Sequence, residues 1–320
     1  MWKLVRGLSL LSTTLVLAAC ASKGGQVAKP LYKLESQAGT TALAVSADSL
    51  KLVTGGWSGR LAIWHLPDGT VVAGLKAHDA EIIGIEFSRD GTFLSGGRDG
   101  SIKQWTPDGR LLQTRDLHSR LSAMTLHQPS DRLATGNMVG EILLWDLGRG
   151  EPAGRWQAHG SRIRAVAYSD DAELLASSDT DRTVKLWNAA RGELLWESQV
   201  PTDSRTLVFS SDGHWLYGGG WFDLFRLNVA TGQLQVIDTD HWGIINDLAL
   251  VKSSGALASV SRQTDSAVLI IDPVTGRTLK NFGSHDLCGE HITVSPDEKY
   301  LISNSDDYSI SVWELGSPPR

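Results

Sequence analysis

The chain has 320 residues, of which 41% are hydrophobic and 21% charged, enough apolar material for a globular core and too much for general disorder. Its formal net charge of −6 disfavours nucleic acid as a partner, because an acidic protein does not attract phosphates. The 33 glycines indicate many turns, and the 12 tryptophans outnumber phenylalanine and tyrosine together. This combination favours β-structure with regularly spaced large aromatic residues.

The first twenty residues have the pattern of a bacterial lipoprotein signal. Lys3 and Arg6 form a basic start, and the apolar stretch from Gly7 to Ala19 is 13 residues long. A bilayer span needs about 20 residues, so this stretch fits the core of a signal peptide instead. Leu-Ala-Ala-Cys at residues 17–20 then resembles a lipobox, in which the cysteine is lipidated after cleavage. The alternative is an ordinary secretory signal with an incidental cysteine.

The lipobox resemblance sets the expected boundaries and location of the mature protein. Residues 1–19 would be the signal peptide, and residues 20–29 the lipidated N-terminus and a flexible tether. Several acyl chains on Cys20 would give stable anchoring. Ala21, rather than aspartate, implies the outer membrane, with the protein facing the periplasm. Cys288 would then be the single remaining thiol, without a disulfide partner in the chain.

A repeated unit occupies nearly all of the remaining chain. Short β-like runs end in tryptophan at five positions, and two further runs fit the same frame with leucine or isoleucine in its place; the seven positions are Trp64, Trp105, Trp145, Trp187, Leu227, Ile271 and Trp313. They are spaced 40–44 residues apart. Turn sequences such as FSRDG and VATG separate the runs, and their glycines can adopt positive φ.

This repeat resembles the WD40 family, whose units of ~40–45 residues each form a four-stranded blade. The resemblance implies an all-β, seven-bladed propeller of antiparallel blades over residues 30–316, followed by a short tail at 317–320. Only seven residues follow Trp313, so the last blade lacks its outer strand. In the family the N-terminal strand completes that blade, and Leu31–Glu35 is available here.

The family also has a buried hydrogen-bonded tetrad of His, Ser or Thr, Asp and Trp, which three units match in full. The three sets are His78, Ser95, Asp99 and Trp105; His159, Ser177, Asp181 and Trp187; and His285, Ser303, Asp307 and Trp313. In each set the aspartate is expected to accept from the imidazole, with the serine bridging to the indole. These units should open less readily than the others.

The other four units depart from the tetrad. The third has His118, Thr135 and Trp145 but Val139 at the aspartate position, and the sixth has His241, Ser259 and Asp265 but Ile271 at the tryptophan position. The first unit offers Ser58 at the aspartate position and no histidine, and the fifth, around residues 218–220, has neither histidine nor tryptophan.

No motif for catalysis or cofactor binding is present, so we expect neither an enzyme nor a cofactor. The Ser, His and Asp of the tetrads recur from unit to unit, as a structural network does and a catalytic one does not. His285, Cys288 and His291 have a metal-like spacing, but a separation of three residues in a strand puts Cys288 and His291 on opposite faces. We therefore expect no metal site.

Strand alignment predicts the residues that face the central channel: Ala42, Gly84, Ala123, Ala165, Thr206, Asp247 and His291. Most of this row is small and uncharged, as crowding near the axis requires. Asp247 and His291 lie in neighbouring units and form a candidate pair. The simple interpretation is a solvated channel lining, and the alternative is a periplasmic propeller enzyme, or a site for a small ligand or metal ion.

The resemblance also implies that partners bind on the face made by the loops into each inner strand and the turns before each tryptophan strand. The candidate residues there are Trp57, Arg98, Arg120, Met138, Arg162, Trp221 and Trp242. Tryptophan, methionine and arginine are enriched at interfaces. Packing of the three tryptophans between blades is the alternative. The sequence thus predicts a monomeric scaffold that docks another envelope protein, or a purely structural part of an envelope assembly.

Overall fold

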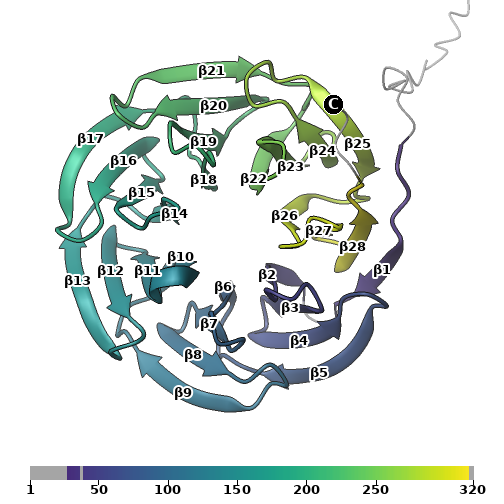
Figure 1. Ribbon diagram of the computed structural model, residues 1–320, viewed down its shortest axis with the longest axis horizontal. Coiled ribbons are helices and arrows are strands. Elements are labelled where there is room, and N and C mark those ends of the chain that lie inside the picture. Colours follow the sequence, from purple (N-terminus) through teal and green to yellow (C-terminus); the bar gives the residue numbers. More distant parts are fainter. Residues whose placement is uncertain (1–26, 37–38, 317–320) are drawn as a thin grey trace, which may run out of the picture.

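The computed structural model describes residues 27–36 and 39–316, and its strands form seven four-stranded antiparallel sheets arranged around a central channel (Figure 1). This confirms the predicted all-β, seven-bladed propeller. The one 3-10 helix of the described residues, η1, spans Gln128–Ser130. The signal peptide, Cys20 and the tail at 317–320 lie outside the described residues.

The first four blades follow one another in chain order, each running from the channel to the rim. Blade 1 contains β2 (Thr40–Val45), β3 (Lys51–Gly56), β4 (Arg60–His65) and β5 (Thr70–Lys76). Blade 2 contains β6 (Ile82–Phe87), β7 (Phe93–Gly97), β8 (Ser101–Trp105) and β9 (Leu111–Asp116). Blade 3 contains β10 (Leu121–His127), β11 (Arg132–Asn137), β12 (Glu141–Asp146) and β13 (Glu151–Gln157). Blade 4 contains β14 (Ile163–Tyr168), β15 (Leu174–Asp179), β16 (Thr183–Asn188) and β17 (Glu193–Gln199).

The last three blades complete the ring. Blade 5 contains β18 (Leu207–Phe209), β19 (Trp215–Gly219), β20 (Asp223–Asn228) and β21 (Leu234–Asp238). Blade 6 contains β22 (Ile244–Val251), β23 (Ala256–Arg262), β24 (Ala267–Ile271) and β25 (Thr278–Ser284). Blade 7 contains β26 (Gly289–Val294), β27 (Tyr300–Ser305), β28 (Ser309–Glu314) and β1 (Tyr32–Glu35).

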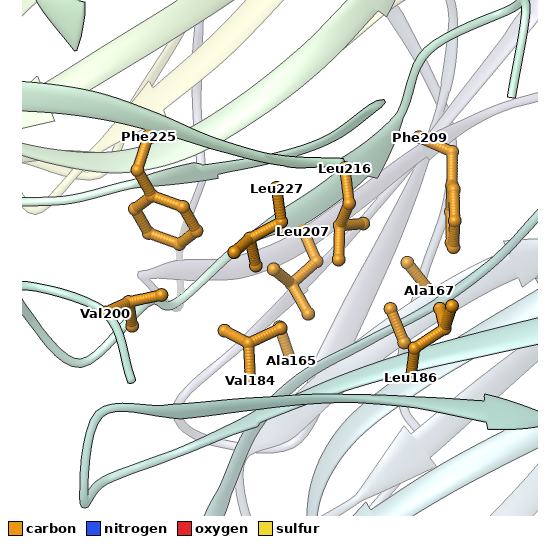
Figure 2. Close-up of a cluster of buried hydrophobic side chains, with 11 residues drawn as sticks. Ala165, Ala167, Val184, Leu186, Val200, Leu207, Phe209, Leu216, Phe225 and Leu227 are labelled. Atoms are coloured by element: carbon orange, nitrogen blue, oxygen red, sulfur yellow. The ribbon is translucent and has the colours of Figure 1, made fainter. Parts of the chain in front are cut away.

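The hydrophobic core lies between adjacent blades, which explains the strand compositions. In Figure 2, Val184 and Leu186 of blade 4 face Leu207, Leu216 and Leu227 of blade 5. Burying one such side chain contributes about 1.5–3 kcal/mol. The second strand of each blade is covered on both faces, and β7 is buried throughout. The outer strands are covered on one face only and expose much of their length.

The ring closes through the N-terminal strand, as the sequence predicts. β1 pairs antiparallel with β28, placing Tyr32 opposite Val312 and Leu34 opposite Ile310. Leu34 is 7% exposed within an apolar cluster shared with blade 1. The Tyr32 hydroxyl donates a hydrogen bond to the carbonyl oxygen of Leu66 in blade 1. Two segments far apart in sequence thus hold the ring together.

Antiparallel pairing assigns every loop to one of two faces. We call upper the face that carries the turns between second and third strands and the loops from each outer strand to the next inner strand. The opposite, lower face carries the remaining turns. Because β28 runs from the upper to the lower face, antiparallel β1 starts at the lower face, with Leu31 52% exposed there. The chain therefore enters the propeller on the side opposite the predicted binding face.

Candidate functional site

Three tryptophans of the upper face are exposed to solvent rather than packed between blades. The exposed fraction is 53% for Trp57, 48% for Trp221 and 71% for Trp242. Trp57 lies in the β3–β4 turn, Trp221 in the β19–β20 turn and Trp242 in the loop before β22. None of these indoles belongs to a blade core, so the face has apolar surface available for a partner.

Neighbouring residues set the positions of these tryptophans. Gly39 has φ of +62°, and a Cβ atom there would lie 2.7 Å from Trp57 Cδ1 and 2.8 Å from Tyr308 Cε1. Glycine therefore lets the Trp57 and Tyr308 rings approach the same point of the backbone. The ring of Trp221 lies 6.0 Å from that of Phe222, which is 46% exposed.

The other candidates of the upper face divide into two groups. Arg98 and Arg162 are half-buried and line the mouth of the central channel, together with Trp57. Arg120 is exposed and Met138 is half-buried; both lie away from the channel. All seven predicted residues are thus on the upper face, but they do not form one uniform patch.

The channel encloses a cavity of about 620 Å³, and all seven residues of the predicted channel row line it. Asp247 and His291 meet there, with His291 Nδ1 at 3.3 Å from Asp247 Oδ2. Burial lowers the pKa of His291, but the hydrogen bond and charge of Asp247 outweigh it and raise the pKa above its usual value. Asp247 also accepts a hydrogen bond from the backbone N–H of Ile292 at 3.1 Å.

Sequence reasoning missed a second set of channel residues, which β-bulges turn inward. The pairing register shifts near the upper end of six inner strands, in β14 between Ile163 and Ala165. A bulge breaks simple alternation, so Arg164 lines the cavity along with Ala165. In other blades the extra residue binds the neighbouring blade; Thr41 Oγ1 donates to the Ile82 carbonyl oxygen at 2.6 Å. Because the bulge recurs at the same place in six inner strands, placing it in the strand alignment would have identified these residues.

The tetrad around Trp105 in blade 2 is brought together in full. His78 lies 3.1 Å from Asp99 through Nδ1 and 2.7 Å from Ser95 Oγ through Nε2. The Trp105 indole donates to Ser95 Oγ at 2.9 Å. Burial lowers the pKa of His78 despite the Asp99 carboxylate. The imidazole is therefore held neutral, as a donor to aspartate and an acceptor from serine.

In blade 4 the predicted aspartate is wrong. His159 and Trp187 both bind Ser177 Oγ, at 2.7 and 2.9 Å, but His159 Nδ1 lies 3.1 Å from Asp179, not Asp181. Asp181 is exposed in the turn. Asp179 occupies the position of Gly97 in blade 2, where an added Cβ would lie 2.3 Å from His78 Nδ1. A side chain at that position comes within 3.1 Å of the imidazole, but without the geometry of a hydrogen bond, so His159 Nδ1 is paired with a different carboxylate by proximity alone.

Blade 7 forms less of its predicted tetrad than the sequence indicates. His285 Nε2 lies 2.7 Å from Ser303 Oγ, but Trp313 Nε1 is buried without a hydrogen-bond partner. Asp307 caps its own turn, accepting from the backbone N–H of Ser309 at 2.8 Å, and influences His285 only through its charge. The prediction of a complete tetrad is therefore wrong for this blade.

In blade 3 the histidine is absent from the predicted partial network. The His118 side chain is 85% exposed and pairs with Asp116 at 3.3 Å. Trp145 Nε1 is buried without a partner, and Val139 is 62% exposed. The assignment of His118 to this network was wrong, because the carboxylate that His118 contacts, Asp116, lies on β9 of blade 2.

In the other blades that lack a complete tetrad, the side chains lie as their sequences predict. In blade 6, His241 lies 2.8 Å from Ser259 Oγ and 3.3 Å from Asp265, beside buried Ile271. In blade 1, Trp64 donates to Thr54 Oγ1 at 3.0 Å without a histidine, and Ser58 is exposed. In blade 5, Gly218 makes room for the Phe225 ring, whose Cζ would lie 2.2 Å from an added Cβ. Tryptophan and phenylalanine thus fill the cores where the network is missing.

Within residues 27–36 and 39–316, no cluster of three or more His, Cys, Asp or Glu side chains is arranged to hold a metal ion. Cys288 is a free, half-buried thiol. No helix in the described part of the chain is long and apolar enough to cross a membrane.

The family "WD domain, G-beta repeat" matches four segments of this chain: residues 28–65, 69–106, 150–188 and 276–314. Each segment begins at or near an outer strand and continues through the first three strands of the next blade, ending just after Trp64, Trp105, Trp187 or Trp313. The protein is thus a seven-bladed β-propeller. It carries recognisable WD40 repeats in four segments, and propellers of this kind generally bind other proteins.

Three similar proteins are each larger than this chain. Human Echinoderm microtubule-associated protein-like 4 is 27% identical over 254 residues, 75% of this chain and 25% of that protein. Autophagy-related protein 16 of Arabidopsis thaliana is 24% identical over 254 residues, 75% of this chain and 49% of its own length. The Periodic tryptophan protein 2 homolog of Dictyostelium discoideum is 24% identical over 215 residues, 63% of this chain and 22% of that protein. This chain therefore spans between 22% and 49% of the length of these relatives.

Proposed function

We propose that this propeller is a protein-interaction scaffold without catalysis of its own, and that its upper face is the docking surface. The exposure of Trp57, Trp221 and Trp242 carries the proposal, because these indoles lie in three separate loops on one face. Large aromatic side chains are the commonest anchors of protein interfaces. An enzyme is disfavoured because Ser95 and His78 are committed to a network that also binds a core tryptophan.

We also propose that the scaffold is a bacterial lipoprotein, anchored through Cys20 in the outer membrane and facing the periplasm. The residues Leu-Ala-Ala-Cys behind a short apolar stretch support the anchor. The start of β1 at the lower face supports an orientation, since a tether joined there leaves the upper face directed away from the membrane. The partner would then be another envelope protein.

Capture of partners from solubilised membranes tests the docking surface. The tagged full chain is compared with a variant carrying Trp57→Ala, Trp221→Ala and Trp242→Ala. A matched control carries Val72→Ala, Leu112→Ala and Leu195→Ala on the outer strands, where these residues are 47–48% exposed. We expect the tryptophan variant to lose about tenfold or more of the specifically captured protein, as hot-spot truncation does. Equal recovery from wild type and tryptophan variant would reject the upper face.

Metabolic labelling with a radioactive fatty acid tests the anchor separately. The full chain should incorporate label and partition into detergent with the membranes. Cys20→Ser should remain unlabelled, whereas Cys288→Ser should label like the wild type. Label that persists in the Cys20→Ser variant would reject lipidation at this residue.

A further inference from the structure

Most arginines at the mouth of the channel are gathered on one side of it. Arg98, Arg162, Arg164 and Arg205, which we call the arginine cluster, all line the cavity on the side of blades 2, 4 and 5. Arg98 pairs with Glu81 at 2.8 Å, and Arg164 pairs with Asp203 at 2.6 Å.

Two members of the cluster are left without such a partner. Within the described residues, neither Arg162 nor Arg205 lies within 4.0 Å of a carboxylate. Burial and the neighbouring guanidinium groups lower the pKa of both Arg162 and Arg205, and the attraction of Glu81 for Arg162 and of Asp203 and Glu290 for Arg205 offsets this only in part. The cluster thus carries an excess of two positive charges.

Several polar atoms of the cluster are buried without a hydrogen-bond acceptor. The Nε atoms of Arg98, Arg162 and Arg164 have no partner in the described structure. Buried donors of this kind are rare, because each loses its hydration without compensation. Guanidinium groups that are half-buried, mutually repelling and short of acceptors are poised to bind an anion.

We propose that the arginine cluster binds two carboxylates of an acidic segment in a partner polypeptide, received between Arg162 and Arg205. A planar guanidinium matches a carboxylate through two parallel hydrogen bonds. The two existing pairs in the cluster, Arg98–Glu81 and Arg164–Asp203, each join one guanidinium nitrogen to one carboxylate oxygen, so these arginines already pair with carboxylates. The proposal rests on the docking function above and names the chemistry of the segment that enters the channel.

The opposite wall of the mouth disfavours more highly charged ligands. Glu290 and Asp306 share Arg262 at 3.2 and 3.6 Å, and the Asp247–His291 pair lies beside them. Carboxylates on that wall would repel a phosphate of charge about −2 more than they repel a single carboxylate. The acidic wall therefore favours singly charged groups held on the arginine side.

A polypeptide is the occupant that fits the surroundings. Trp57 lines the same cavity as Arg98, so the channel mouth is continuous with the docking surface. A segment that covers the exposed indoles can place acidic side chains into the mouth without a separate binding event.

Fluorescence polarisation with a labelled, end-blocked peptide of four glutamates tests the proposal on the purified full chain. We expect saturable binding at low salt that weakens as salt is raised. The variant Arg162→Ala/Arg205→Ala should bind at least about tenfold more weakly, because it loses both charge-assisted contacts. Arg162→Lys/Arg205→Lys should lose less affinity, since it keeps the positive charges but not the planar guanidinium groups that make two parallel hydrogen bonds. Arg110→Ala, exposed in the β8–β9 turn of the lower face, is the matched control and should change affinity less than twofold.

Competitors and a neutral peptide separate the alternatives. Four glutamines should not bind. Citrate that displaces the peptide at equal or lower concentration would replace the polypeptide with a small polycarboxylate, and inorganic phosphate that does so would reject carboxylate as the preferred group. Absence of binding, or equal loss in Arg110→Ala, would overturn the site. None of these outcomes depends on partner capture by the tryptophans, so the two proposals can fail separately.

Discussion

Blades 2 and 3 contain similar residues at similar spacing, yet only blade 2 brings them together. His78 in blade 2 is 1% exposed and contacts Ser95 and Asp99, whereas the His118 side chain in blade 3 is 85% exposed. The backbone differs as well, because His118 has φ of +52° and its N–H binds Asp116 Oδ1 at 2.8 Å. Similar sequence patterns thus give opposite side-chain positions.

The carboxylate decides between these positions. In blade 2, Asp99 lies in the β7–β8 turn of the same blade and accepts from the imidazole. In blade 3 the corresponding residue is Val139, and the nearest carboxylate, Asp116, lies outside. A buried imidazole without an acceptor for its N–H would lose its hydration and gain no hydrogen bond in return, so His118 stays in solvent. The Trp145 indole N–H is then left without a partner.

Replacing each histidine by alanine gives the largest difference between the two blades. His78→Ala removes two hydrogen bonds and leaves a cavity, so we expect the free energy of unfolding to fall by about 3–4 kcal/mol. His118→Ala alters an exposed side chain and should change it by less than about 0.5 kcal/mol. Denaturant unfolding of both variants measures the difference. Equal effects would show that the network in blade 2 does not stabilise the fold.

Acid should destabilise the blades whose histidines are buried. Burial, opposed by the charge of Asp307, lowers the pKa of His285 from 6.5 to about 4. The unfolded chain binds this proton first, so stability is present above pH 6.5 and decreases as the pH falls towards 4. The loss should be about 3 kcal/mol from His285 alone. Burial lowers the pKa of His159 in the same direction.

Unfolding measured from pH 7 to pH 4.5 checks this dependence. His285→Gln should remove part of the slope, while His118→Ala should leave it unchanged. A His285→Gln variant with the same pH dependence as the wild type would contradict the burial of a neutral His285.

Substitutions that copy blade 4 should restore the hydrogen-bond network of blade 3. This change has the smallest predicted effect on stability. Asn137 occupies the position of Asp179, and Asp116 occupies that of Gln157. The double variant Asn137→Asp/Asp116→Gln supplies an internal acceptor and removes the external one. We expect His118 to enter the blade and stability to rise by about 1 kcal/mol. Slower exchange of the Trp145 indole proton by NMR would report the new hydrogen bond, and an unchanged exchange rate would refute it.

Much of the fold could be predicted from the sequence because it depends on periodic features. The seven units, the closing strand Tyr32–Glu35 and the complete network around Trp105 follow from spacing and residue type. The carboxylate in blade 4 could not be predicted in this way, because Asp179 and Asp181 both lie within reach of one turn. Sequence spacing does not determine which of two nearby carboxylates meets an imidazole.

The sequence predicted the face that carries the candidate site, but not all of the residues that line the channel there. Trp57, Trp221 and Trp242 were placed correctly on the upper face, because loop positions follow from strand order. Arg164 and Arg205 were missed. A bulge in β14 turns Arg164 inward, and β18 is too short to follow the common alignment at Arg205. Local irregularities of the backbone therefore decide what the channel presents.

Site-specific photocrosslinking in intact cells tests the docking face most directly. A photoreactive phenylalanine derivative is placed at position 57 or 242, and at position 72 or 195 on the outer strands as controls. We predict a discrete protein adduct from positions 57 and 242 and none from positions 72 and 195. Adducts that arise only from the outer strands would contradict the proposal that this propeller docks its partner through the upper face.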